Sequence, residues 1–257
     1  MTYNLKIICY IVCSLFICSC AHKSGHRREK KQSEQIMNNQ TLDDIMIITE
    51  EIPLDNDTNI DYGAVNLVSS NQKYDGKEIF AKYNKAVFMV FTTDGMNTYQ
   101  GSGFFISSTG IAVSNYHVFQ GTSIGAEAIK LVESETAYKV TDILARNEDE
   151  DFIIFKVNIT NTDFIPISYE KPSVGERVFT IGSPYGLENT FSSGEVSQWR
   201  DTNLMQISAQ IDHGSSGGAL INEYGEAVGI TTGSFADGSQ ANLNYAWSID
   251  VIKPYIK

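Results

Sequence analysis

The sequence predicts an all-β fold, either a barrel or a sandwich. Ten short runs rich in β-branched and aromatic residues follow one another between residues 86 and 249, and such residues favour strands. Turn pairs such as Asp94-Gly95 and Asp237-Gly238 separate these runs. Many short strands divided by turns are typical of barrels and sandwiches. The predicted strands are 86–92, 103–107, 111–114, 137–144, 152–157, 177–181, 195–199, 204–208, 227–232 and 244–249.

The composition is that of a globular protein with an acidic surface. Of the 257 residues 42% are hydrophobic and 19% are charged, and the formal net charge is −12. An acidic chain lacks the basic face that phosphate recognition needs, so we expect no nucleic-acid partner. Two short helices are predicted beside the strands. One lies at 76–84, where apolar residues recur at helical spacing, and the other at 250–253.

Residues 1–19 have the pattern of an export signal. Lys6 precedes an apolar run of about a dozen residues, shorter than the roughly 20 that a membrane-spanning helix needs. All four cysteines lie in residues 1–20. We therefore expect no disulfide in the mature domain, whose stability would come from its packed core.

The end of this signal offers two processing sites. The run Ile17-Cys18-Ser19-Cys20 resembles a bacterial lipobox, which implies cleavage before Cys20 and attachment of lipid to its sulfur. The alternative is cleavage after Ala21, which would give a secreted soluble protein. We favour the lipoprotein, held at the membrane of the bacterial cell envelope and facing the periplasm or the cell surface.

Residues 20–75 are interpreted as a polar linker. Basic residues gather at 27–31 and acidic residues from 43 to 61, and segregated charge without a core-forming period indicates a solvated segment. The basic cluster would suit an anionic lipid surface, although a merely soluble stretch fits equally well. A short strand or docking segment is expected within 45–52.

One serine-rich and glycine-rich stretch suggests chemistry. The run Gly214-Ser215-Ser216-Gly217-Gly218-Ala219-Leu220 is either an ordinary turn or a nucleophile loop, in which glycines let backbone N–H groups point at one spot. A nucleophilic serine needs a base, and histidine is the side chain that titrates near neutral pH. Beyond the N-terminal region the histidines are His117 and His213.

The base and its carboxylate partner are predicted from strand ends. His117 follows the apolar strand 111–114 and Asp151 directly precedes the strand 152–157, so each would be delivered to a cleft. Asp149 competes with Asp151, which we prefer because it adjoins the strand. His213 lies in the same loop as Ser216 and is interpreted as a loop or subsite residue. The predicted triad is His117, Asp151 and Ser216.

Five motifs in order resemble the protease domain of trypsin-like, HtrA-type serine endopeptidases over residues 76–257. The resemblance implies two six-stranded β-barrels with the active site in the cleft between them. We expect no PDZ module of the kind that many HtrA relatives carry after this domain. The motifs are Gly101-Ser102-Gly103-Phe104-Phe105-Ile106, Ser114-Asn115-Tyr116-His117-Val118, Asp151-Phe152-Ile153-Ile154-Phe155-Lys156-Val157, Ile181-Gly182-Ser183-Pro184-Tyr185-Gly186-Leu187 and the Gly214 run.

The resemblance also assigns roles. It implies that Ser216 attacks a peptide carbonyl, that His117 transfers the proton, that Asp151 orients the imidazole, and that the N–H groups of Gly214 and Ser216 bind the oxyanion. Polypeptide substrates are implied, with no cofactor and no metal. The alternative is a catalytically weak or inactive peptide-binding, chaperone-like module on the same fold.

The segments around the nucleophile are expected to contact substrate. By the resemblance these residues are Ile211, His213, Thr232, Gly233 and Ser234, and Ile211 favours an apolar pocket for small or medium aliphatic side chains. Asp212 would favour basic ones if it points inward. Ser215 departs from the family, because digestive trypsin-like enzymes have aspartate there and HtrA-type enzymes usually have asparagine. Activation through an ion pair at that position is therefore not expected, and the oxyanion loop loses one support. The oligomeric state is not predicted.

Overall fold

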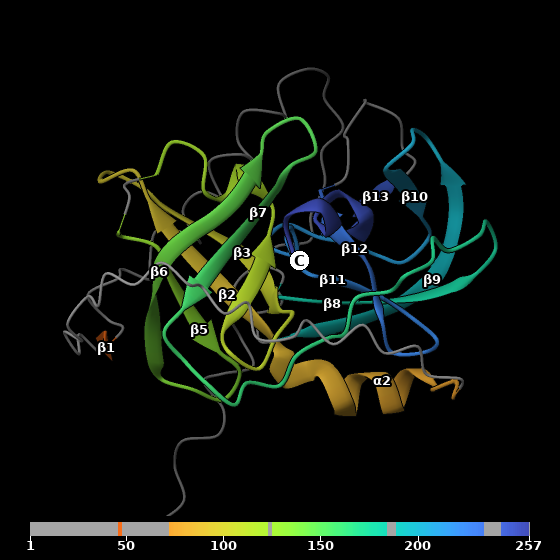
Figure 1. The fold of residues 1–257 in the computed structure, drawn as a ribbon, viewed down its shortest axis with the longest axis horizontal. Helices are drawn as coiled ribbons and strands as arrows, with labels where there is room; N and C mark the ends of the chain where they lie inside the picture. The colour runs from red at the N-terminus through yellow and green to blue at the C-terminus, as the bar shows by residue number, and fades with distance from the viewer. Residues whose placement is uncertain (1–45, 48–71, 123–124, 184–188, 234–242, 257) are drawn as a thin grey trace, which may run out of the picture. The chain divides into compact units, whose positions relative to one another are not determined.

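The computed structural model describes residues 46–47, 72–122, 125–183, 189–233 and 243–256, all within the unit Gln40–Lys257. These residues form two closed barrels, each of six antiparallel strands (Figure 1). The all-β prediction and the double barrel implied by the family resemblance are confirmed. The predicted signal, Cys20 and most of the predicted linker lie outside the described residues.

The first barrel contains β2 to β7 and closes by pairing β6 with β7. Its strand order is β6-β5-β2-β3-β4-β7. A further two-residue strand, β1 (Met46–Ile47), pairs in parallel with Thr136 and Ala137 of β6, within the region 45–52 where a short strand was expected. The strands are β2 (Val87–Thr93), β3 (Thr98–Phe105), β4 (Ile111–Ser114), β5 (Ala128–Leu131), β6 (Thr136–Asn147) and β7 (Phe152–Val157).

Aromatic rings fill this barrel. Phe88 packs against Phe105 and Phe155, with ring centroids 4.6 and 6.3 Å away, and Phe119 lies 5.3 Å from Phe155. Tilted and edge-on aromatic pairs of this kind add to the free energy gained by burying their area. Because Phe119 follows His117 by two residues, this core also anchors the segment that carries the predicted base.

The second barrel contains β8 to β13 in the order β10-β13-β12-β11-β8-β9. Its interior is formed mainly by aliphatic side chains, among them Val178, Met205, Ile207 and Leu220. The nucleophile loop leads directly into β11, so the barrel wall fixes its far end. The strands are β8 (Arg177–Gly182), β9 (Thr190–Trp199), β10 (Leu204–Ile207), β11 (Ala219–Asn222), β12 (Ala227–Thr232) and β13 (Asn244–Ser248).

A third apolar cluster joins the two barrels and includes the flanking helical segments. Helix α2 (Gly76–Tyr83) contributes Ile79 and Tyr83 to it. The helix begins with a capping box, in which the carboxylate of Asp75 accepts from Glu78 N at 2.9 Å and that of Glu78 accepts from Asp75 N at 2.8 Å. The predicted C-terminal helix consists of two 3₁₀ turns, η6 (Ile249–Val251) and η7 (Lys253–Tyr255).

The observed strands differ from the predicted ones where the sequence is polar or the run is short. The runs 111–114, 152–157 and 227–232 match β4, β7 and β12 at both ends. Strands β5 and β11 have four residues each and were not predicted. The polar first halves of β3 and β9 were also missed, because partly exposed pairing strands carry no apolar run for a pattern to detect.

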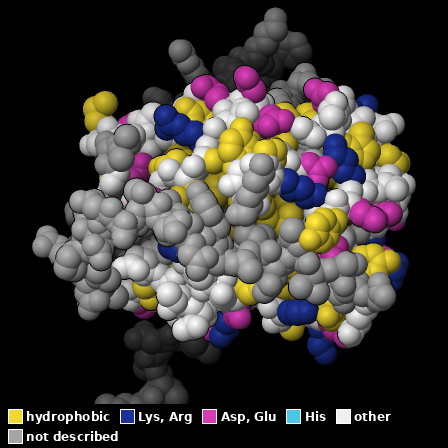
Figure 2. All heavy atoms as spheres, in the orientation of Figure 1, with side chains coloured by type: hydrophobic (Ala, Val, Ile, Leu, Met, Phe, Trp, Pro, Cys, Tyr) yellow, Lys and Arg dark blue, Asp and Glu magenta, His cyan; other side chains and the backbone are white. Residues whose placement is uncertain are grey.

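Charged side chains of both signs are interspersed on the face shown in Figure 2. No helix within the described ranges is long and apolar enough to span a bilayer. Large apolar side chains that are exposed lie on several separate turns and strands, as is ordinary for a protein surface. They are Met96, Tyr99, Ile143, Tyr169, Val174, Tyr224 and Tyr255.

Candidate active site

His117 and Asp151 form a two-point contact. Nδ1 of His117 lies 2.8 Å from Oδ2 of Asp151, and the backbone N–H of His117 donates to Oδ1 at 2.9 Å. The His117 side chain is 45% exposed, whereas that of Asp151 is 16% exposed. An ionised carboxylate only accepts hydrogen bonds, so Nδ1 donates to it and Nε2 is left for another partner.

The pairing of two strands brings these residues together. Strand β4 leads into the 3₁₀ turn η4 (Tyr116–Val118), which contains His117, and a turn ending at Asp151 leads into β7. Strands β4 and β7 are antiparallel neighbours, with Ser114 opposite Ile153. The end of one strand and the start of the other therefore meet at the same edge of the first barrel.

Two further side chains hold Asp151. Its backbone has φ 45°, a left-handed conformation that costs free energy in a residue other than glycine. The side-chain amide of Asn115 donates to the Asp151 carbonyl at 2.8 Å. The hydroxyl of Thr232 in the second barrel donates to Oδ2 at 3.1 Å. The carboxylate is thus fixed from both barrels.

Ser216 lies beside this pair in the loop before β11. Its hydroxyl oxygen is 3.8 Å from the position that a Cβ on Gly233 would occupy, and Gly233 directly follows Thr232, the hydrogen-bond partner of Asp151. The carbonyl of Ser216 accepts from Ser102 N at 2.8 Å. Within the described ranges the Ser216 hydroxyl makes no hydrogen bond to His117. Such contacts are often loose in the absence of substrate.

The backbone of the nucleophile loop leaves two amides available. Gly214 has φ 93°, in the left-handed region that favours glycine. Ser215 N donates to Asp212 O at 2.9 Å and Gly217 N to Thr231 O at 2.8 Å. The N–H groups of Gly214 and Ser216 have no acceptor among the described residues. These are the two donors predicted for the oxyanion.

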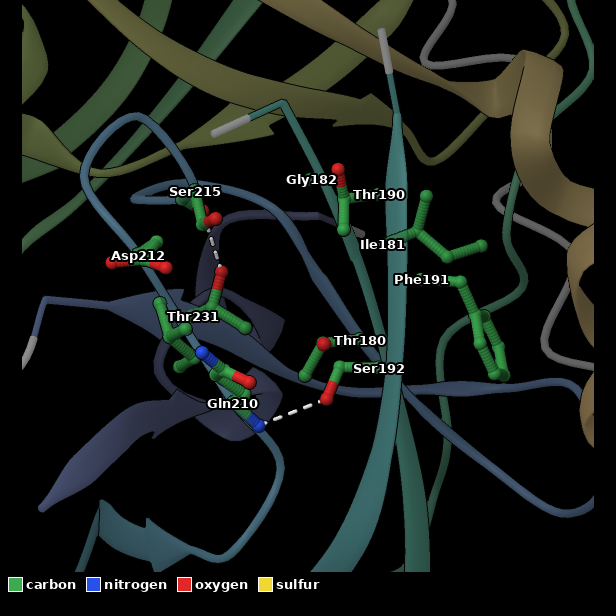
Figure 3. A pocket seen from close by; sticks show the side chains of 11 residues that line it. Thr180, Ile181, Gly182, Thr190, Phe191, Ser192, Gln210, Asp212, Ser215 and Thr231 are labelled. Carbon is green, nitrogen blue, oxygen red and sulfur yellow. Dashed lines mark hydrogen bonds between the residues drawn. The ribbon is translucent and has the colours of Figure 1, made fainter. Parts of the chain in front are cut away.

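A cavity of about 200 Å³ lies along the nucleophile loop, against β8 and β9 (Figure 3). Gln210 and Asp212 lie on one side of it and Phe191 on the other (Figure 3), and Ile211 and Ser192 also line it. Gln210 N donates to the hydroxyl of Ser192 at 2.9 Å across this space (Figure 3). The remaining lining residues are Thr180, Ile181, Gly182, Thr190, Ser215 and Thr231.

The residues predicted to contact substrate lie in different surroundings. Ile211 is 7% exposed and packs in the core of the second barrel, while His213 is exposed. Thr232 is buried with its hydroxyl on Asp151, and Gly233 adjoins the Ser216 hydroxyl. Ser234 lies outside the described residues.

Sequence reasoning missed several side chains that support the site. Asn115 was noted within a motif but given no role. Thr232 was predicted only to contact substrate, and Ser102 was noted only as part of a glycine-rich motif. The sequence offered one signal for these supporting side chains. Each has a hydroxyl or an amide and lies in a run with apolar neighbours, next to a predicted site residue.

The two six-stranded barrels are those of a trypsin-like protease domain. Residues 101–230 match the family model described as "Trypsin-like peptidase domain". The chain therefore belongs to this family, and its domain is of the HtrA type.

Sequence relatives support the same assignment. The chain is 32% identical over 174 residues to the "Probable periplasmic serine endoprotease DegP-like" of Rhizobium meliloti, covering 62% of this chain and 33% of that protein. It is 30% identical over 170 residues to the serine endoprotease DegS of Haemophilus influenzae, covering 61% and 49%. The match thus spans one half or less of the length of these two relatives.

A solved structure has the same architecture. The serine endoprotease from Yersinia pestis is 26% identical, with a TM-score of 0.63 over 72% of this chain and 66% of that one. The similarity to HtrA-type proteases therefore holds in three dimensions as well as in sequence.

Proposed function

We propose that this protein is a serine endopeptidase that hydrolyses peptide bonds through Ser216, His117 and Asp151. The observation that carries the proposal is the two-point contact between His117 and Asp151, which holds the imidazole with Nε2 directed away from the acid. In chymotrypsin-like geometry that nitrogen serves the nucleophilic serine.

The reaction follows from these positions. His117 takes the proton of the Ser216 hydroxyl as its oxygen attacks the scissile carbonyl carbon, and the proton then passes to the leaving amine. Water attacks the resulting acyl-enzyme with His117 again as base, which releases the acid and restores Ser216. The N–H groups of Gly214 and Ser216 stabilise the oxyanion, and each such donor is worth about 2.7 to 4 kcal/mol in the transition state.

The substrates are polypeptides in an extended conformation. Thr232 and Gly233 lie at the end of β12 beside Ser216, where an added peptide strand would place its carbonyl near the hydroxyl. Ile211 and His213 border the same loop, and the apolar surface of Ile211 favours small or medium aliphatic side chains. Ser234 would extend the strand contact.

A location in the bacterial cell envelope completes the proposal. Residues 1–19 serve as a lipoprotein signal, Cys20 carries the lipid, residues 20–75 act as the linker and residues 76–257 form the protease domain. The name of the Rhizobium meliloti relative, "Probable periplasmic serine endoprotease DegP-like", supports this location. The activity would then be protein processing or quality control near the membrane.

The second candidate is a peptide-binding module with weak or no catalysis. The absence of a hydrogen bond from the Ser216 hydroxyl to His117 in the described part of the chain favours it, as does the missing carboxylate at Ser215. Both candidates use the same cleft, so binding of peptide alone does not separate them.

A fluorophosphonate probe separates the two candidates. The full chain and its Ser216→Ala variant are incubated with the probe and, separately, with casein. Labelling and casein cleavage by the wild-type protein alone are the expected results. Absence of labelling in both proteins, with casein still bound, would establish the binding module instead.

The anchor is tested separately. A Cys20→Ser variant is expected to move from the membrane fraction to the soluble fraction of the producing cells. Unchanged membrane association of this variant would overturn the lipid attachment at Cys20 while leaving the protease assignment intact.

A further inference from the structure

Three successive carbonyl groups of the nucleophile loop are held by residues outside the loop. The carbonyl of Gly214 accepts from the Ser102 hydroxyl at 2.7 Å. That of Ser215 accepts from the Thr231 hydroxyl at 2.8 Å (Figure 3), and that of Ser216 accepts from the backbone N–H of Ser102 at 2.8 Å. Ser102 lies on β3 of the first barrel and Thr231 on β12 of the second. The loop is therefore fixed from both barrels.

The hydroxyl of Ser102 has a defined orientation. It accepts from Ser183 N at 2.9 Å, and a hydroxyl carries a single proton, which is thus directed at the Gly214 carbonyl. Ser102 is fully buried and Thr231 is 1% exposed, so both donor residues are shielded from water. Hydrogen bonds from such fixed donors restrict the peptide planes that accept them.

The amide groups of the same segment show the complementary pattern. The carbonyls of Gly214, Ser215 and Ser216 are held, whereas the N–H groups of Gly214 and Ser216 have no acceptor in the described part of the chain, and Ser215 N is bonded to Asp212 O. A rotation of these peptide planes would break the carbonyl contacts. A carbonyl shares its peptide plane with the N–H of the next residue. The Ser215 carbonyl contact therefore fixes the plane of the Ser216 N–H directly, whereas the Gly214 carbonyl contact restrains the Gly214 N–H through the adjoining peptide.

The side chain of Ser215 does not hold the nucleophile loop in place. Within the described ranges its hydroxyl makes no hydrogen bond, and it is too short and uncharged to form an ion pair. The support for the loop must come from other residues, and the contacts at Gly214 and Ser215 are the ones that reach it through side chains.

We propose that Ser102 and Thr231 are positioning residues that hold the oxyanion-binding amides of Gly214 and Ser216 in place. The proposal rests on the peptidase function proposed above and names the residues that replace a side-chain anchor at Ser215. Both residues act through the backbone of the loop.

The consequence is a loss of reaction rate with unchanged binding. Removing the Ser102 hydroxyl leaves the Gly214 carbonyl unpaired within the described ranges, and removing the Thr231 hydroxyl leaves the Ser215 carbonyl with only the bond from Gly218 N at 2.9 Å. Such a loss is worth about 1 to 3 kcal/mol, and the peptide then rotates toward another donor. If that free energy is lost from transition-state stabilisation, the rate falls about tenfold to a hundredfold. The affinity of the unreacted probe does not depend on the oxyanion contacts and is expected to stay unchanged.

The experiment measures saturation kinetics of fluorophosphonate labelling on the full chain. Ser102→Ala and Thr231→Val, which remove the hydroxyls, are expected to lower the maximal labelling rate about tenfold to a hundredfold each, with the half-saturating probe concentration unchanged. Thr231→Ser, which keeps the hydroxyl, is expected to restore the rate relative to Thr231→Val. A thermal melt of each variant confirms that it is folded.

Ser168→Ala provides the matched control. Ser168 is 2% exposed, and its hydroxyl is bonded to the Glu226 carboxylate at 3.1 Å, away from the nucleophile loop. This variant is expected to lose stability without losing labelling rate.

Three other results would overturn the proposal. One is labelling by folded Ser102→Ala and Thr231→Val at rates within twofold of wild type, which would leave the peptidase function standing. The second is a rate for Thr231→Ser as low as that for Thr231→Val. The third is wild-type protein that labels no better than Ser216→Ala, which would remove the peptidase function itself.

Discussion

The side-chain amide of Asn115 donates a hydrogen bond to the backbone carbonyl of Asp151, 2.8 Å from nitrogen to oxygen. Asn115 is fully buried, and its own side-chain oxygen has no hydrogen-bond partner in the described part of the protein. A buried oxygen without a partner destabilises a fold. A contribution to stability alone thus does not explain why an asparagine occupies this position. Its hydrogen bond to the carbonyl of Asp151, a residue in the left-handed conformation, does explain it.

Asn115→Ala is expected to lower kcat/KM about tenfold to a hundredfold, mainly through kcat. The reason is that the Asp151 carbonyl loses its partner, worth about 1 to 3 kcal/mol, and the strained peptide relaxes away from His117. Cleavage of a peptide substrate derived from casein measures the effect. Asn222→Ala removes a side chain with comparable turn contacts far from the site and should leave kcat/KM unchanged. An Asn115→Ala protein that melts earlier but cleaves normally would contradict the expectation.

Thr232 supports the same carboxylate from the other barrel. Its hydroxyl donates to Asp151 at 3.1 Å, and hydrogen bonds to charged groups contribute about 1.5 to 3 kcal/mol. Thr232→Val keeps the shape of the side chain and is expected to lower kcat/KM by about tenfold. Thr232→Ser is expected to recover most of this loss. Equal rates for the Val and Ser variants would show that the hydroxyl is not needed.

Local patterns sufficed to predict the fold class and the meeting of His117 with Asp151. Both residues adjoin apolar strands, 111–114 and 152–157, whose bounds the structure reproduces. Once two such strands pair, the residues at their adjoining ends lie close together. The part of the candidate site that depends on strand ends could therefore be predicted from the sequence.

Contacts across the two barrels were not predictable in this way. Ser102 and Gly214 are 112 positions apart, and their hydrogen bond depends on how β3 of one barrel faces a loop of the other. A hydrophobic period tells which side of a strand is buried, but not which distant carbonyl a buried hydroxyl meets. The polar halves of β3 and β9 escaped prediction for a related reason, because their pairing partners and not their own side chains make them strands.

The aromatic core of the first barrel sets a large part of its stability. Phe88 is fully buried, 4.6 Å from the ring of Phe105. Phe88→Ala is expected to lower the free energy of unfolding by about 3 to 5 kcal/mol, measured by the shift of the urea midpoint at constant slope. Tyr169→Ala, at a side chain that is 58% exposed, should change it by about 0.5 kcal/mol or less. A loss below about 1 kcal/mol for Phe88→Ala would show that the barrel interior repacks.

The turn between β2 and β3 gives the fold a dependence on pH. The carboxylate of Asp94 accepts hydrogen bonds from two backbone N–H groups and two side-chain donors. These bonds hold the pKa of Asp94 well below its usual range, and the bond from the Asn97 N–H is the largest cause. A depressed pKa in the folded state stabilises the fold above the ordinary aspartate pKa of about 3.9, and the stabilisation is lost as the pH falls further. At pH 7 the wild-type protein should therefore have a higher melting temperature than Asp94→Asn. The difference between the two melting temperatures should shrink progressively below about pH 4. Asp163→Asn, which removes one exposed charge without a hydrogen bond in the described ranges, controls for net charge. A gap between wild type and Asp94→Asn that stays constant or widens on acidification would contradict this account of the turn.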